Sequence, residues 1–165
     1  MPLDAADAHS LMLASIGEGI FGIDLDGRCT FVNPAALQLL GHRTESVLGR
    51  NMHDLVHHTH PDGRHYPECD CPIFKAFRLG KPCRIDDEVL WRADGTPFEA
   101  EYASHPILEQ GRVVGAVVSF VDIGERKRGE TLLRRANDVL EARVAERTGE
   151  LNDALTRLRD LAQHL

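Results

Sequence analysis

The length, composition and charge of this chain exclude several classes of protein before any motif is considered. Its 165 residues are 42% hydrophobic and 27% charged, which suits a soluble domain with one appendage. There is no apolar run of membrane-spanning length, so we expect a cytoplasmic chain without membrane contact. Of the 19 basic and 26 acidic residues, 9 and 8 lie from Glu125 onward, which leaves the upstream part strongly acidic. An acidic domain without a basic stripe is poorly suited to nucleic acid.

The first predicted elements are two strands and a helix. Residues 20–25 and 29–32 are short β-prone runs around an Asp-Gly turn signal, which predicts a β-hairpin. Asn33 then ends the second strand and caps a helix that begins at Pro34. Upstream, apolar residues at helical spacing predict a short amphipathic helix over residues 7–16.

The middle of the chain predicts short helices, and its last part predicts three strands. Pro61-Asp62-Gly63 favours a turn, and Pro72 marks the start of a helix that ends before Gly80. The remaining elements are helical turns at residues 44–47 and from about 49–51, and strands at 83–91, 98–108 and 112–121. We interpret Asp86-Asp87-Glu88 as a solvated strand edge.

Three stretches, in the right order, resemble PAS sensory domains. They are the opening Gly17 to Pro34, the run Gly41 to Arg50 after the first helix, and Val121 to Lys127, which is similar to the Asp-Ile-Thr exit of that family. The resemblance implies an α+β fold, a five-stranded antiparallel sheet with short helices on one face, followed by a long C-terminal coiled-coil helix. The expected division is an N-terminal helix in 1–16, a PAS domain in 17–124 and a coiled-coil signalling linker in 125–165.

The resemblance also implies an apolar ligand pocket. Flavin-binding light sensors of this family form an adduct with a cysteine, but Met52 stands at that position, so only non-covalent flavin is left open. The candidate pocket residues are Phe31, Phe74, Phe77, Trp91, Phe98 and Tyr102.

The segment Met52 to Cys71 is the densest in metal-binding residue types. It holds five of the nine histidines and two of the four cysteines, and these groups suit zinc, iron or copper, while histidine alone can hold haem. Much of the segment also matches a turn and helix-start pattern common in PAS domains. The candidate metal or redox residues are His53, His57, His60, Cys69 and Cys71, the three histidines sharing one helical stripe.

Cys71 has a second predicted property. It precedes Pro72 at a helix start, where backbone N–H groups and the helix dipole favour a thiolate. This predicts an oxidisable thiol, with Cys69, Cys29 or Cys83 as disulfide partners. The alternative is a small buried cap residue.

The tail from Leu133 carries heptad spacing that predicts a parallel two-stranded coiled coil. It resembles the linkers that follow PAS domains in bacterial sensor kinases, which implies a downstream kinase or other output domain. No catalytic motif is present, so we expect a non-enzymatic input module. The alternatives are a metal- or haem-bearing redox sensor and a purely structural dimeriser. The predicted homodimer interface consists of Leu133, Asn137, Leu140, Val144, Leu151, Leu158 and Leu161.

Overall fold

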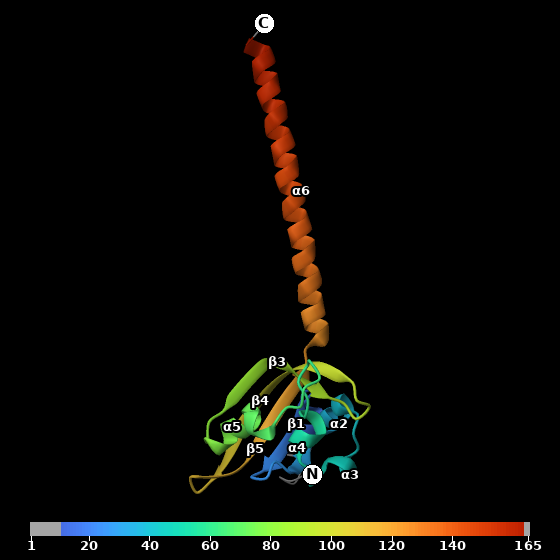
Figure 1. Cartoon of the computed structure of the whole chain (residues 1–165), viewed down its shortest axis with the longest axis vertical. Helices are drawn as coiled ribbons and strands as arrows, with labels where there is room; N and C mark the ends of the chain where they lie inside the picture. Colours follow the sequence, from blue (N-terminus) through green and yellow to red (C-terminus); the bar gives the residue numbers. More distant parts are fainter. Residues whose placement is uncertain (1–10, 164–165) are drawn as a thin grey trace, which may run out of the picture. The chain divides into compact units, whose positions relative to one another are not determined.

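The computed structural model describes residues 11–163, which form two compact units divided between Gly124 and Glu125 (Figure 1). The N-terminal unit contains a five-stranded antiparallel sheet, with the strands in the order β2-β1-β5-β4-β3. This confirms the predicted α+β fold. The strands are β1 Gly19–Asp24, β2 Cys29–Val32, β3 Cys83–Trp91, β4 Pro97–Glu109 and β5 Arg112–Asp122.

Short helices connect β2 to β3 and cover one face of the sheet (Figure 1). They are α2 Pro34–Leu40, α3 Thr44–Val47, α4 Met52–Val56, the 3₁₀ turn η1 Glu68–Asp70 and α5 Pro72–Arg78. Side chains alternate along the strands, so Phe21, Tyr102 and Phe120 are buried beneath the helices. The core therefore lies between the sheet and this helical layer.

Asn33 joins the first hairpin to the helical layer, as the sequence predicts. Its Oδ1 accepts hydrogen bonds from the backbone N–H of Ala36 at 2.9 Å and of Ile20 at 2.8 Å. Its Nδ2 donates to the carbonyls of Leu13 and Glu18. One buried amide thus caps α2 and ties it to the start of β1.

One predicted helix lies partly outside the described residues, and another ends earlier than predicted. Of the helix predicted over residues 7–16, only the second half lies in the described part, where residues 11–15 are helical. The helix that begins after Asn51 ends at Val56, so His60 lies in the following loop rather than on one stripe with His53 and His57. His57 is the residue that ends this short helix, so of the three histidines only His53 and His57 keep the i, i+4 spacing along it.

The second unit is the single helix α6, Gly124–Gln163, which confirms the predicted long C-terminal helix. From Glu125 onward its described side chains are exposed in the single chain except that of Lys127, which is half-buried, and all seven residues of the predicted interface are among the exposed ones. None of the helices described here is both long and apolar enough to cross a bilayer. The coiled coil and the dimer remain predictions.

Candidate ligand and metal site

Two buried histidines lie at the ends of one turn of α4. Asn51 caps this helix, its Oδ1 accepting from the N–H groups of His53 and Asp54. His57 ends the helix and its N–H donates to the carbonyl of His53 at 2.9 Å. The i, i+4 spacing brings the two rings to a centroid distance of 5.6 Å, with both side chains buried.

Cys71 meets His57 from the start of α5. It precedes Pro72, and its Sγ lies 3.2 Å from Nδ1 of His57 in the buried interior. Burial raises the pKa of this thiol to about 11, although the N–H groups of Phe74 and Ile73 act in the opposite direction. The helix start therefore favours a thiolate as predicted, but burial is the larger effect and keeps the metal-free thiol protonated at neutral pH.

Glu88 enters the site from β3 because of a β-bulge. Ile85 pairs with Tyr102 and Glu88 with Ala100, so one extra residue on β3 turns Glu88 toward the helices. The interpretation of Glu88 as part of a solvated edge is therefore wrong. Its Oε2 lies 2.8 Å from Nε2 of His57, a close polar contact without the alignment of a hydrogen bond.

Two tyrosines hold the Glu88 carboxylate in place. The hydroxyl of Tyr66 donates to Oε1 at 2.7 Å and the hydroxyl of Tyr102 donates to Oε2 at 2.5 Å. Burial alone would raise the pKa of Glu88, but His57 and the two hydroxyls outweigh it and lower the pKa to about 2. Glu88 is thus ionised while it lies against His57.

His53 is a further buried polar side chain of the site. Its Nε2 lies 2.8 Å from the carbonyl oxygen of Tyr66, so Nε2 carries the proton and donates, and Nδ1 keeps a lone pair. Nδ1 is buried and has no hydrogen-bond partner. Burial lowers the pKa of this ring and so favours the neutral form.

His53, His57 and Cys71 form a compact donor set, because one ring nitrogen of each histidine and Sγ of Cys71 all lie within 4.8 Å of one another. They line a small cavity together with Met52, Phe74 and neighbouring apolar side chains. The volume of this cavity is about 10 Å³, which is enough for one small species. Flavin or haem would require the helices to move apart, because sites for such groups are tens of times larger.

Comparison with known proteins decides the family. The family model described as PAS fold matches residues 9–123. The chain belongs to the PAS family. Sensor protein CitS of Halalkalibacterium halodurans is 31% identical over 151 residues, a match that covers 86% of this chain and 24% of that protein. The chain therefore spans about a quarter of the length of this curated relative.

Solved PAS domains share the fold at low sequence identity. The PAS domain of nitrogen regulation protein NR(II) from Vibrio parahaemolyticus superposes with a TM-score of 0.56 at 19% identity, covering 70% of this chain and 97% of that one. The PAS domain of a protein from Colwellia psychrerythraea gives a TM-score of 0.61 at 20% identity, covering 74% and 99%. These likenesses support the fold and leave the ligand open.

The PAS domain brings together three of the five predicted metal or redox residues. His53, His57 and Cys71 share the cavity, whereas Cys69 is exposed on η1. His60 stacks on the ring of Tyr66 at a centroid distance of 3.9 Å. All four cysteines are free.

The predicted aromatic pocket residues divide between several roles. Phe74 lines the cavity, Phe77 is buried in the core, and Tyr102 holds Glu88. Trp91 instead donates from Nε1 to the carbonyl of Thr59 at 2.8 Å, which fastens the loop after α4 to β3. The remaining two are Phe98, which lies under the Arg92 guanidinium, and Phe31, which faces away from the cavity over Gly22.

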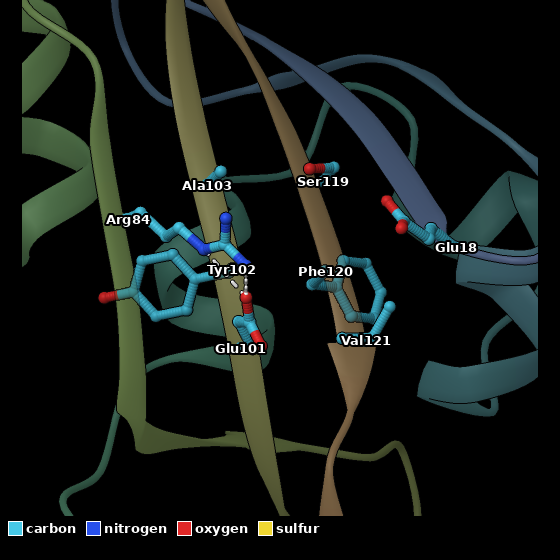
Figure 2. Close-up of a pocket in the computed structure, with 8 residues that line it drawn as sticks. All are labelled: Glu18, Arg84, Glu101, Tyr102, Ala103, Ser119, Phe120 and Val121. Atoms are coloured by element: carbon cyan, nitrogen blue, oxygen red, sulfur yellow. Dashed lines mark hydrogen bonds and ion pairs between the residues drawn. The ribbon is translucent and has the colours of Figure 1, made fainter.

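The other face of the PAS sheet carries an open hollow, shown in Figure 2. Arg84 of β3 reaches over Glu101 of β4 there and pairs with it, and the residue opposite Glu101 on β5 is Val121 (Figure 2). The residues that line it are Glu18, Arg84, Glu101, Tyr102, Ala103, Ser119, Phe120 and Val121. This polar surface is separate from the His/Cys cavity, because the strand alternation places the two on opposite faces.

Sequence reasoning did not assign Glu88 or Tyr66 to the site. The spacing of apolar residues in β3 carries a signal for Glu88. Ile85 and Leu90 both face the core, although strict alternation would place residues 85 and 90 on opposite faces of the sheet. That mismatch indicates a bulge, after which Glu88 shares a face with Leu90. Tyr66 lies in a loop, where no periodicity predicts its direction.

Asp122 holds the exit from the PAS sheet. Its Oδ1 accepts from the N–H of Gly124 at 2.9 Å, and its Oδ2 pairs with Arg92 at 2.8 Å. The next residue, Ile123, donates its N–H to the carbonyl of Glu99 on β4. Strand pairing thus continues up to the first residue of α6.

Proposed function

We propose that this chain is the PAS input module of a sensor histidine kinase, and that it relays a ligand or redox signal through a dimeric coiled coil. The signalling role follows from membership of the PAS family and from similarity to a protein named as a sensor. The kinase output rests on the resemblance of the tail to sensor-kinase linkers. Catalysis then belongs to a downstream domain. Four cysteines without a disulfide among them suit a reducing compartment, which supports a cytoplasmic location.

The observation that carries the proposal is the hydrogen-bonded route from the buried site to α6. Tyr102 on β4 holds Glu88 and pairs with Phe120 on β5. Two residues after Phe120, Asp122 accepts from the backbone N–H of Gly124 at the start of α6. A change at the His/Cys cavity that shifts Glu88 would therefore move the strand pair that ends at the helix start.

The coiled coil is the second part of the proposal. The seam of α6 alternates spacings of four and three, with Asn137 at a core position, where asparagine fixes register in parallel dimers. These side chains are exposed in the single chain, and a second copy of α6 would cover them. Coupling would then consist of a small rotation or register shift of the paired helices.

Cross-linking between the two α6 helices tests this function. In a Cys69→Ser background, Asn137→Cys lies on the seam and Ala142→Cys lies on the opposite side of the helix. With a short bismaleimide we expect efficient cross-linking of the first and little of the second. The yield at position 137 should change when zinc or a mild thiol oxidant is added. Identical yields in every state would contradict the relay and favour a purely structural dimeriser.

A further inference from the structure

We propose that His53, His57 and Cys71 bind one zinc(II) ion inside the PAS domain. The donor set is preorganised: each imidazole has one nitrogen committed to a partner outside the cavity and the other available within it. Nε2 of His53 is held by the carbonyl of Tyr66, and Nε2 of His57 by the carboxylate of Glu88. This leaves the two Nδ1 atoms and Sγ of Cys71 as ligands. Metal-binding histidines are oriented in this way by carbonyl and carboxylate partners.

The unpartnered Nδ1 of His53 is the observation that singles out an ion. It is a buried acceptor without a hydrogen bond, in a side chain that is 4% exposed. Burying a polar atom without a hydrogen bond costs free energy, and coordination to a metal ion would offset that cost. In the metal-free chain the Cys71 thiol donates to Nδ1 of His57, and nothing comparable reaches His53.

The donor types favour zinc. Zinc displaces the proton of the Cys71 thiol, which passes to solvent, and a zinc–thiolate bond forms in its place. Imidazole nitrogen and thiolate sulfur are ligand types that zinc takes in proteins. Thiolate and imidazole also disfavour magnesium and calcium, which prefer oxygen ligands.

The geometry requires only a modest contraction. One ring nitrogen of each histidine and Sγ of Cys71 lie within 4.8 Å of one another, and the cavity they line holds about one small species. Zinc bonds of roughly 2.0 to 2.3 Å would draw the donors together by less than the width of an atom. Three protein ligands leave a fourth position for an external molecule, as in zinc sites that exchange ligands. A role of the ion as receiver of the signal rests on the proposed function. The binding of the ion can be tested independently of that function.

Zinc titration of the chelator-treated 165-residue chain, against a competing chromophoric chelator, tests the proposal. We expect one equivalent of zinc, little effect of magnesium or calcium, and a cobalt(II)–thiolate absorption band when Co²⁺ replaces Zn²⁺. Cys71→Ser should remove that band, and His53→Gln should weaken zinc binding. Glu88→Gln, which changes the group that lies against Nε2 of His57 and accepts from two tyrosines, should weaken it by about 10- to 100-fold. Circular dichroism of each variant checks that it is folded.

Cys69 and His65 are exposed in the same segment and provide matched controls. Cys69→Ser and His65→Ala should leave stoichiometry and affinity unchanged. Absence of a tight equivalent in the folded wild type, a cobalt band that survives Cys71→Ser, or loss of binding in Cys69→Ser would each overturn the site. Copper(I) bound in preference to zinc would overturn the assignment of the metal. Zinc binding without any change in α6 cross-linking would refute the relay and leave the zinc site standing. A change of cross-linking with a mild oxidant, in a wild type that binds no zinc, would refute the zinc site and leave the relay standing.

Discussion

The carboxylate of Glu88 lies 2.8 Å from Nε2 of His57, across the interior between β3 and the end of α4. Two tyrosine hydroxyls donate to the same carboxylate, from the loop after α4 and from β4. One charged group therefore connects three separate parts of the PAS domain. Removing one of these partners would leave the carboxylate incompletely paired, which would lower the stability of the domain.

Replacing Glu88 by glutamine should destabilise the PAS domain by about 2 kcal/mol, since hydrogen bonds to a charged group contribute more than neutral ones. Urea unfolding of the metal-stripped chain measures this. Asp70→Asn is the matched control, because Asp70 pairs with Lys75 on the exposed surface at 3.7 Å. Its effect should stay below about 0.5 kcal/mol. Equal effects of the two substitutions would show that the buried network contributes nothing specific.

Stability should fall as the pH of the metal-stripped protein is lowered. Folding lowers the pKa of Glu88 from 4.5 to about 2, so the unfolded chain binds this proton first. The stability that Glu88 contributes is therefore fully present above pH 4.5 and is lost as the pH falls toward about 2. Burial also lowers the pKa of His53 from 6.5, which adds a loss in the same direction below pH 6.5.

Unfolding free energies measured between pH 7 and pH 3 check this dependence. Glu88→Gln should flatten the curve below pH 4.5 and leave the part that arises from His53. Wild type and Glu88→Gln curves that run parallel throughout this range would contradict the low pKa of Glu88.

Much of the fold follows from local sequence signals, and much of the site does not. Asn33, the Asp-Gly turn and the three strand runs predict their elements, because capping and turn chemistry act within a few residues. The site depends on tertiary relationships. The bulge that turns Glu88 inward and the early end of α4 that removes His60 are both set by packing between distant segments. Periodicity of the sequence alone carries no such information.

Asp122→Ala should loosen the start of α6 without unfolding the PAS sheet. It removes the acceptor for the N–H of Gly124 and the ion pair with Arg92. Loss of a helix cap costs about 1 kcal/mol, so hydrogen exchange should quicken for the first amides of α6. Amides of β4 and β5 remote from the exit should keep their protection. Unchanged exchange at Gly124 would mean that Asp122 does not cap the helix in solution.

The seam of α6 can be distinguished from its other exposed leucines by one pair of substitutions. Leu151 and Leu132 are both 65% exposed in the single chain, so exposure alone predicts the same response to a charge. Only Leu151 lies on the heptad seam, where a glutamate from each copy would meet its counterpart inside the interface. Leu151→Glu should therefore convert the dimer to a monomer at micromolar concentration, while Leu132→Glu remains dimeric. Sedimentation equilibrium measures both, and dissociation of the Leu132 variant alone would place the interface on another face of α6.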